Sequence, residues 1–427
     1  MKVLIVGGGG REAALAWWIA GSPRVDRVLC APGNGGIPGS VPVAAEDLDA
    51  VAALATRERV DLVVVGPEVP LVAGLVDRLG GDGVPTFGPS AAAARLEGSK
   101  VWAKAFFERW DIPTPEAAAF DDADAALAHL DTLAEVPVVK ASGLAAGKGV
   151  LLPEDWAGAA AAVRSMLVEG RFGSAGSEIL LEARTRGREV SVLAVCAGTE
   201  ARLLVPAQDH KRLADGDQGP NTGGMGAFAP STLPPGVLER IEAEVIAPAL
   251  RGLEAEGTPY LGVLYAGVML TEEGPQVLEF NCRFGDPETQ VILPLCASDP
   301  LDVFEGALAG AVPELRWHDG AAVTVVMAAP GYPDTPHTGH EIGGLAAADA
   351  TGCQVFTAGV RRADDGRLLT AGGRVLNVTG TGSTVAAAAD TAYRGLAELT
   401  FEGAQWRRDI GRGPAAVTAA VGQGVVL

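Results

Sequence analysis

Residues 138–150 read VVKASGLAAGKGV. This segment superficially resembles the phosphate-binding P-loop, but only three residues separate its first two glycines, and Gly149 stands where that loop needs Ser or Thr. No helical pattern follows the glycines either. The segment therefore predicts a β-hairpin whose loop folds over a triphosphate, with Lys140 on the incoming strand and Lys148 at the tip. A mobile hairpin with solvated lysines is the alternative.

Length and composition limit the possible functions. The chain has 427 residues, 48% of them hydrophobic and 20% charged, which predicts a globular protein of about three domains. Its formal net charge of −20 repels nucleic acid and anionic lipid, so we expect neither as a partner. An anionic ligand would need a local cluster of cations.

The cysteines and the chain start indicate a compartment. Five scattered cysteines form no CxxC pair, which argues against a zinc site or a disulfide framework and favours a reducing environment. No apolar run approaches the roughly 18 residues of a membrane helix. The N-terminus opens with a strand and a glycine turn rather than a signal peptide, so we expect a soluble cytoplasmic protein with no membrane partner.

Lysine is scarce in this chain, with six lysines against 27 arginines. A compact ammonium group on a flexible stem is not replaceable by guanidinium in a tight phosphate pocket. Each lysine is therefore a candidate site residue, and the six are Lys2, Lys100, Lys104, Lys140, Lys148 and Lys211.

The pattern of elements predicts a multidomain α/β and α+β protein. Strands and helices alternate up to about residue 88, as in a doubly wound unit. After the glycine-rich hairpin we expect a long loop from Gln208 to Pro230 and a helix over Pro235–Glu256. A hairpin of Val263–Leu270 and Gln276–Asn281 should follow, and short strands dominate from about Ala321.

A second glycine turn follows the first strand. Gly8-x-Gly10-x-x-Ala13 fits a strand–turn–helix site in which backbone N–H groups bind an anion. A dinucleotide site would need an acidic residue at the end of the second strand, but that strand ends at Cys30-Ala31-Pro32. NAD is therefore disfavoured, while a sugar phosphate and a structural turn both stay open.

The strand ending at residues 279–281 carries candidate metal ligands. Glu279 and Asn281 share one face of this strand, and their oxygens are the hard ligands that Mg²⁺ prefers. Arg283 could clamp an anion, and Asp286 and Glu288 could bind an amine. A half-exposed strand followed by a charged turn is the alternative.

The loop from Gln208 onward is the third candidate. Long loops in compact domains are usually functional, and this one is rich in glycine. Asp209 and His210 indicate acid–base or ionic roles. A serine-nucleophile hydrolase is not supported, because the chain has no GxSxG elbow.

Together these segments resemble the glycinamide ribonucleotide synthetases, the phosphoribosylamine–glycine ligases of the ATP-grasp superfamily. The matching segments cover essentially the whole chain in order: Gly7–Glu12, Gly66–Glu68, Ser99–Lys100, Lys140–Val150, Gln208–Arg212, Pro220–Gly226 and Leu278–Gln290.

This resemblance implies four parts and a reaction. The parts are a Rossmann-like N-terminal domain (1–100), an ATP-grasp core (101–122 and 189–320), an inserted lid (123–188) and a small β-rich C-terminal domain (321–427). The implied reaction joins glycine to 5-phosphoribosylamine in purine synthesis, with ATP cleaved to ADP and phosphate through glycyl phosphate. The implied enzyme uses Mg²⁺ or Mn²⁺, and we expect a monomer.

Positions that match the family motifs imply the site residues. ATP would be held by Lys100, Lys140, Gly147, Lys148, Glu182 at the adenine hinge and Glu189 at the ribose. The metal would be held by Glu279 and Asn281. Arg283, Asp209 and Lys211 would be catalytic, and Gly8, Gly9, Gly10, Asp286 and Pro287 would bind the acceptor substrates.

Two positions depart from the family pattern. Ala13 stands where many relatives have His, and the hinge reads Glu182-Ala183-Arg184 where a second acid and a bulky apolar residue are usual. Three other functions are possible alternatives: a different ATP-grasp ligase, a nicotinamide oxidoreductase and a catalytically silent ATP-binding scaffold. The acceptor-side segments oppose the first, the missing acid after Cys30 the second, and the intact Glu279, Asn281 and lysines the third.

Overall fold

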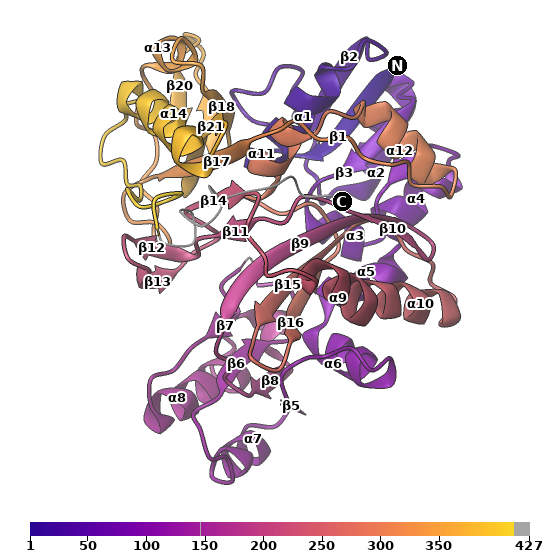
Figure 1. Ribbon diagram of the computed structural model, residues 1–427, viewed down its shortest axis with the longest axis vertical. Coiled ribbons are helices and arrows are strands. Elements are labelled where there is room, and N and C mark those ends of the chain that lie inside the picture. Colours follow the sequence, from indigo (N-terminus) through magenta and orange to yellow (C-terminus); the bar gives the residue numbers. More distant parts are fainter. Residues whose placement is uncertain (146, 414–427) are drawn as a thin grey trace.

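The N-terminal unit is a parallel sheet with helices on both faces. A computed structural model describes residues 1–145 and 147–413, so residues 414–427 of the expected C-terminal domain lie outside it. In β1, Leu4 and Val6 face one apolar cluster, and Val3 and Ile5 face another, so both faces of the strand are buried. The sheet order is β2-β1-β3-β4, and its elements are β1 (Lys2–Gly7), α1 (Gly10–Ala20), β2 (Arg27–Pro32), α2 (Leu48–Glu58), β3 (Leu62–Val65), α3 (Glu68–Val72), α4 (Leu75–Gly81), β4 (Thr86–Phe87) and α5 (Ala91–Gly98) (Figure 1).

An antiparallel sheet forms the centre of the molecule. The predicted helix and hairpin are both confirmed here, the helix as three consecutive helical segments. Its apolar cluster is continuous with that of the N-terminal sheet, so the two units pack as one body. The sheet order is β10-β9-β15-β16, and its elements are α6 (Lys100–Arg109), β9 (Arg188–Ala197), β10 (Glu200–Leu203), α9 (Val237–Ile241), η2 (Glu242–Ile246), α10 (Ala247–Ala255), β15 (Leu261–Leu270) and β16 (Pro275–Asn281).

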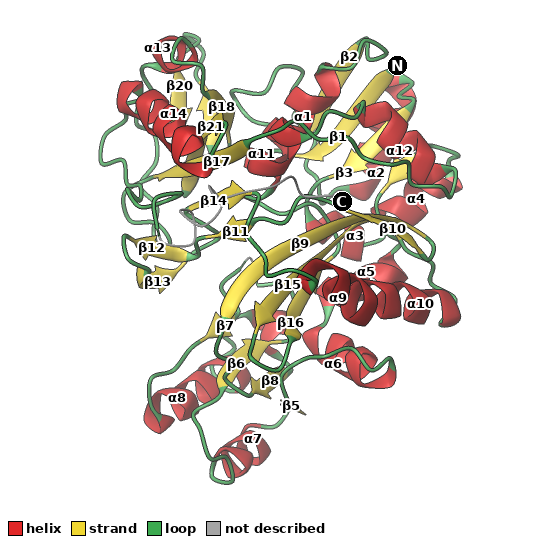
Figure 2. Ribbon diagram, viewed as in Figure 1, coloured by secondary structure: helices red, strands yellow, loops and turns green. Residues whose placement is uncertain are grey.

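The lid is a small lobe with an apolar cluster of its own, at the bottom of Figure 2. The glycine-rich segment forms the predicted hairpin, with Val139 opposite Leu151 and Lys140 opposite Val150. Its sheet also contains β5, so the lid sheet begins before the expected boundary at residue 123. The sheet order is β5-β8-β6-β7, and the elements are β5 (Ala117–Phe120), α7 (Ala123–Leu130), β6 (Val138–Ala141), β7 (Val150–Leu151), α8 (Trp156–Leu167), η1 (Gly173–Gly176) and β8 (Ile179–Glu182).

The C-terminal sheet recruits strands from the expected loop. We expected a loop from Gln208 to Pro230, and this expectation is wrong in part: four short strands lie in it, and β11 and β14 join the C-terminal sheet. β14 pairs with β17, which is about a hundred residues away in sequence, and β11 joins the sheet through β14. No local pattern reveals this placement. The strands of the segment are β11 (Gln208–Asp209), β12 (Arg212–Ala214), β13 (Gln218–Asn221) and β14 (Gly226–Ala229).

The rest of the C-terminal part is β-rich, as expected. The sheet order is β11-β14-β17-β21-β18, with α14 against β21 and β17. Helix α12 precedes this part and packs on the N-terminal sheet, beside α1. The remaining elements are α11 (Thr289–Ile292), η3 (Leu293–Leu295), α12 (Pro300–Leu308), β17 (Ala321–Ala328), α13 (Leu345–Asp349), β18 (Gln354–Thr357), β19 (Val360–Arg362), β20 (Leu368–Thr370), β21 (Arg374–Gly382) and α14 (Val385–Glu398). Within the described ranges, no helix is long and apolar enough to cross a membrane.

Candidate active site

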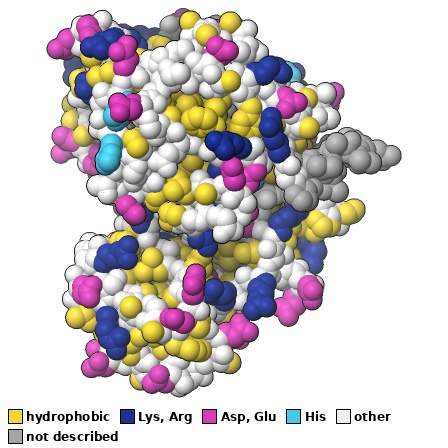
Figure 3. Space-filling model, turned by 90° about the vertical axis from the view of Figure 1, so that its left-hand side faces the viewer, with side chains coloured by type: hydrophobic (Ala, Val, Ile, Leu, Met, Phe, Trp, Pro, Cys, Tyr) yellow, Lys and Arg dark blue, Asp and Glu magenta, His cyan; other side chains and the backbone are white. Residues whose placement is uncertain are grey.

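A cleft of about 630 Å³ lies where the lid, the central sheet, α5–α6 and β21 meet. In Figure 3 the surface narrows between the body and the lower lobe, and Lys and Arg side chains gather along this narrowing. Most of the predicted site residues line the cleft, and these are Lys100, Lys140, Gly147, Glu182, Glu189, Asp209, Lys211, Glu279, Asn281, Arg283 and Asp286.

The remaining predicted residues lie beside the cleft. Lys148 is exposed in the lid loop, next to Gly147. Pro287 is buried behind the cleft, against Gly224. Of the N-terminal turn Gly8–Gly10, Gly9 comes nearest, since a Cβ there would lie 3.4 Å from Oδ2 of Asp286. The glycine turn is thus adjacent to the cleft rather than part of its lining.

One buried carboxylate holds two lysines at the lid end of the cleft. Oε1 of Glu182 lies 2.5 Å from Nζ of Lys140, and Oε2 lies 2.7 Å from Nζ of Lys104. The 2.7 Å contact between Lys104 and Glu182 is an ion pair. Lys104 also donates to Thr114 Oγ1 (2.5 Å) and to the carbonyl of Pro115 (2.8 Å). The cluster carries one net positive charge when both lysines are protonated, as a polyphosphate requires.

Lys104 is a cleft residue that the site prediction omitted, although the scarcity of lysine had marked it. Burial lowers the pKa of its ammonium to about 8, and the negative charge of Glu182 opposes this shift only in part. Lys104 therefore changes its charge within the working range of many enzymes.

Some hydrogen-bonding groups of the hinge after Glu182 already have partners within the protein. The N–H of Ala183 donates to the carbonyl of Glu116 (2.8 Å), and Arg184 donates to the carbonyl of Pro153. A nucleotide base at this edge would therefore meet backbone groups other than the Ala183 N–H.

Glu279 and Asn281 enter the cleft from β16, as the strand alternation predicts. Burial alone would raise the pKa of Glu279, but Lys211, Lys100 and Lys140 lower it below its ordinary value. Oδ1 of Asn281 accepts a hydrogen bond from Arg283 (3.0 Å) and keeps a second lone pair. An ionised carboxylate beside an amide oxygen fits a hard divalent cation whose other ligands are phosphate oxygens and water.

Lys211 and Glu189 form an ion pair across the cleft, with about a third of each side chain exposed. Burial opposes the charge of Lys211, yet its pKa is raised because Glu189, Glu279 and Asp209 surround it. Lys211 therefore stays protonated beside the candidate metal ligands.

Arg283 lies between two carboxylates from the N-terminal part. Its guanidinium donates to Glu97 (2.7 Å) and to Glu68 (3.2 Å). Burial and the neighbouring Glu68 raise the pKa of Glu97, although Arg283 opposes the shift. Sequence reasoning missed Glu97, and Glu68 appeared only in a matching segment, because both meet Arg283 across more than 180 residues.

A second acidic pair, Asp209 and Glu288, lies in the cleft lining near Lys211. Oε1 of Glu288 accepts hydrogen bonds from Tyr265 (2.6 Å) and Ser191 (2.9 Å). Oδ1 of Asp209 is shielded from solvent and has no partner among the described residues. Burial and the charge of Glu288 raise the pKa of Asp209 well above its ordinary value, although Lys211 opposes this. Asp209 is thus a carboxyl group able to take up a proton.

His210, which the sequence linked to Asp209 as an acid–base candidate, is not a residue of the cleft lining. Its ring lies 5.9 Å from that of Phe228. Burial and the nearby charge of Arg407 lower its pKa to about 4, so the imidazole is neutral near pH 7. A proton-transfer role for His210 therefore finds no support in its placement.

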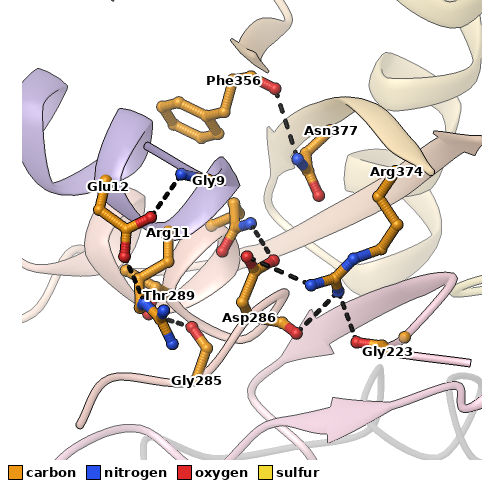
Figure 4. Close-up of polar contacts among 12 residues, drawn as sticks. Gly9, Arg11, Glu12, Gly223, Gly285, Asp286, Thr289, Phe356, Arg374 and Asn377 are labelled. Carbon is orange, nitrogen blue, oxygen red and sulfur yellow. Dashed lines mark hydrogen bonds and ion pairs between the residues drawn. The ribbon is translucent and has the colours of Figure 1, made fainter. Parts of the chain in front are cut away.

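Asp286 connects the cleft to two other domains (Figure 4). Its carboxylate lies 3.3 Å from Nη2 of Arg374. Nη1 of the same guanidinium donates to the Asp286 carbonyl (2.9 Å) and to the carbonyl of Gly223. Burial would raise the pKa of Asp286, but Arg374 and Arg11 lower it. Arg374 was missed because the C-terminal part carries no recognisable motif.

The N-terminus of α1 already holds side-chain anions. The N–H of Gly9 donates to Oε2 of Glu12 (2.5 Å), and Asp286 lies at the same helix end. An incoming anionic group would therefore have to share this region with two carboxylates, with Arg11 and Arg374 as the nearby cations.

Comparison with known proteins finds matches along most of the chain. The phosphoribosylglycinamide synthetase N domain matches residues 1–97, the ATP-grasp (A) domain 98–289 and the C domain 322–413. A phosphoribosylamine–glycine ligase of Allochromatium vinosum is 49% identical over 96% of this chain and 98% of its own length.

Two solved structures extend the comparison. The crystal structure of a phosphoribosylamine–glycine ligase from Thermotoga maritima is similar with a TM-score of 0.85 and 34% identity, over 96% of this chain and all of that one. The biotin carboxylase domain of a Hydrogenobacter thermophilus 2-oxoglutarate carboxylase, solved with MgADP, shares the fold at a TM-score of 0.67 and 16% identity, over 95% and 91% of the two chains. By its three matching domains and its close relatives, the chain belongs to the phosphoribosylglycinamide synthetase family of ATP-grasp enzymes.

Proposed function

We propose that this protein joins glycine to 5-phosphoribosylamine and forms glycinamide ribonucleotide, ADP and phosphate, a step of purine biosynthesis. One observation carries the proposal: a single cleft holds a lysine cluster suited to a polyphosphate and, at its other end, carboxylates and arginines suited to an amino acid and an amine. Family membership and the names of the close relatives agree with it.

The chemistry requires activation of the glycine carboxylate. A carboxylate oxygen of glycine attacks the γ-phosphorus of ATP, so that ADP leaves and glycyl phosphate forms. The amine of phosphoribosylamine then attacks the carbonyl carbon, phosphate leaves with that oxygen, and the amine loses a proton. Positive charge at the transferring phosphoryl group stabilises the first step, because negative charge spreads over its oxygens.

The ATP end of the cleft would use the predicted residues and one more. Lys100 and Lys140 line the cleft beside Glu279, and the exposed Lys148 would reach the phosphates when the lid moves over them. Lys140 must then leave Glu182 or share it, while Lys104 stays to neutralise that carboxylate. Glu182 marks the adenine hinge, Gly147 belongs to the loop over the phosphates, and Glu189 would hold the ribose.

The metal site would be formed by Glu279 and Asn281. A divalent cation there, Mg²⁺ or Mn²⁺, supplies charge that offsets the phosphate oxygens and orients them. Glu279 is kept ionised by the surrounding lysines, and Arg283 orients the Asn281 amide through its hydrogen bond.

The acceptor end would bind glycine and the sugar amine. Arg283 would bind the glycine carboxylate, and its pairing with Glu68 and Glu97 fixes its orientation. Asp209 would accept the proton that the attacking amine loses, and Lys211 would stabilise the charge on the leaving phosphate. Asp286 and Pro287 would border the sugar amine, with the sugar phosphate between Gly8–Gly10 and Arg374.

We also propose that the protein acts as a monomer with the domain ranges given above, except that the lid sheet also includes β5. Light scattering of the purified protein at micromolar concentration tests the monomer.

Oxygen labelling tests the proposed mechanism. With glycine labelled by ¹⁸O in its carboxylate, one labelled oxygen should appear in each phosphate released, because that oxygen bridges carbon and phosphorus in glycyl phosphate. Phosphate without label would refute the acyl phosphate route even if glycinamide ribonucleotide is formed.

A further inference from the structure

Arg407 is a fully buried arginine that lies far along the chain from every motif of the cleft. It follows α14, and its side chain is 1% exposed. Its Nε and Nη2 donate to Asp409 (2.8 and 2.6 Å), and its Nη1 donates to Asp217 (2.6 Å) and to the carbonyl of Arg212 (3.2 Å). Two of these acceptors, Asp217 and Arg212, belong to the β12–β13 hairpin.

The segment 407–409 forms two further hydrogen bonds with the tip of the hairpin. Asp409 accepts a hydrogen bond from the N–H of Gly216 (2.9 Å), and the N–H of Arg408 donates to Asp215 (2.7 Å). Tyr393 of α14 fixes the segment in turn, because its hydroxyl donates to the carbonyl of Arg407 (3.0 Å). The tip is otherwise exposed, so these contacts supply its tertiary anchoring.

The base of the hairpin is part of the cleft wall. Asp209 and Lys211 precede the first strand of the hairpin, and Asn221–Gly223 lie at the end of its second strand and just after it. All of these residues line the cleft. Thr222 joins the two sides, since its N–H and its hydroxyl both donate to the carbonyl of Lys211 (2.8 Å each). Arg407 bonds the next carbonyl along the chain, that of Arg212.

We propose that Arg407 is a positioning residue of the ligase reaction, which holds the β12–β13 hairpin so that Asp209, Lys211 and Asn221–Gly223 face the acceptor substrates. Arg407 touches no substrate, and a buried guanidinium with three acceptors on two segments can fix the angle between them. This inference rests on the proposed function, because the effect is assigned to the glycine and sugar-amine end of the cleft.

Steady-state kinetics of Arg407→Met and Asp217→Gly test the inference. Asp217 has a φ of 55°, which glycine adopts without strain, and its side chain is exposed, so the second variant loses one contact and keeps the buried Arg407–Asp409 pair. For both variants we expect the KM for glycine and phosphoribosylamine to rise about tenfold, and the KM for ATP to stay within about twofold. Arg407→Lys should recover part of the loss.

Arg408→Gln is the matched control. The side chain of Arg408, next to Arg407 in sequence, is exposed, and only its backbone N–H joins the network. Hydrogen exchange should quicken in residues 212–221 of both test variants and stay unchanged in β17 and β21. Equal KM changes for ATP and the acceptors, or faster exchange throughout the C-terminal sheet, would overturn the positioning role in favour of a general stabilising one. Hydrogen exchange can be measured without turnover, so it tests the positioning role even if the ligase reaction is not observed. Wild-type protein that does not catalyse the reaction would refute the proposed function and not the hairpin contacts.

Discussion

The carboxylate of Asp286 and the guanidinium of Arg374 lie 3.3 Å apart, although 88 residues separate them in the sequence. This ion pair joins the segment after β16 to the first residue of β21. The C-terminal part therefore contributes a charge to the cleft and does more than support it.

Replacing Arg374 tests that contribution. Arg374→Met should raise the KM for phosphoribosylamine about tenfold or more and change the KM for ATP little, because the lost cation lies at the acceptor end. Initial rates at varied phosphoribosylamine measure this. Arg394→Met, on the exposed face of α14, is the control. If the KM for ATP rose as much as that for phosphoribosylamine, the assignment of Arg374 to the acceptor end would fail.

Glu279 tests the metal assignment. Glu279→Ala should lower kcat by about 10²–10³-fold while the fold persists, because one of the two proposed protein ligands of the cation is lost. Turnover titrated with Mg²⁺ and circular dichroism report the two effects. Glu273→Gln, in the exposed turn of the same hairpin, should behave as wild type. Normal metal-dependent turnover in Glu279→Ala would remove this residue from the metal site.

Lys104 predicts a pH dependence. Its pKa in the free enzyme is about 8, so its charge is present below that pH and is lost as the pH rises above it. The value of kcat/KM for ATP should therefore fall as the pH increases from 7 to 9, because that parameter reports the free enzyme. Lys104→Met should be slower at pH 7 by about tenfold and should lack this decline. The same decline in the variant would assign it to another group.

The parts of the fold with strong local patterns could be predicted from the sequence. The β6–β7 hairpin, the β15–β16 hairpin and the helix before it all follow from periodicity and turn residues. The strands β11 and β14 could not, because both are short and enter the C-terminal sheet through the pairing of β14 with the distant strand β17.

The candidate site divides in the same way. Glu279 and Asn281 were predicted from strand alternation, and Lys140 from the scarcity of lysine, since both signals are local. Arg374 and Glu97 act through contacts with residues far away in sequence, which composition and spacing do not encode. The glycine turn at Gly8–Gly10 shows a further limit, because its pattern does not reveal that Glu12 already accepts from Gly9.

The most direct test of the account is phosphate release from ATP and Mg²⁺, with glycine and phosphoribosylamine added singly and together. The account predicts rapid release only when both are present, with one ADP and one glycinamide ribonucleotide formed per phosphate. Release that ignores phosphoribosylamine, or that needs another carboxylate in place of glycine, would contradict it.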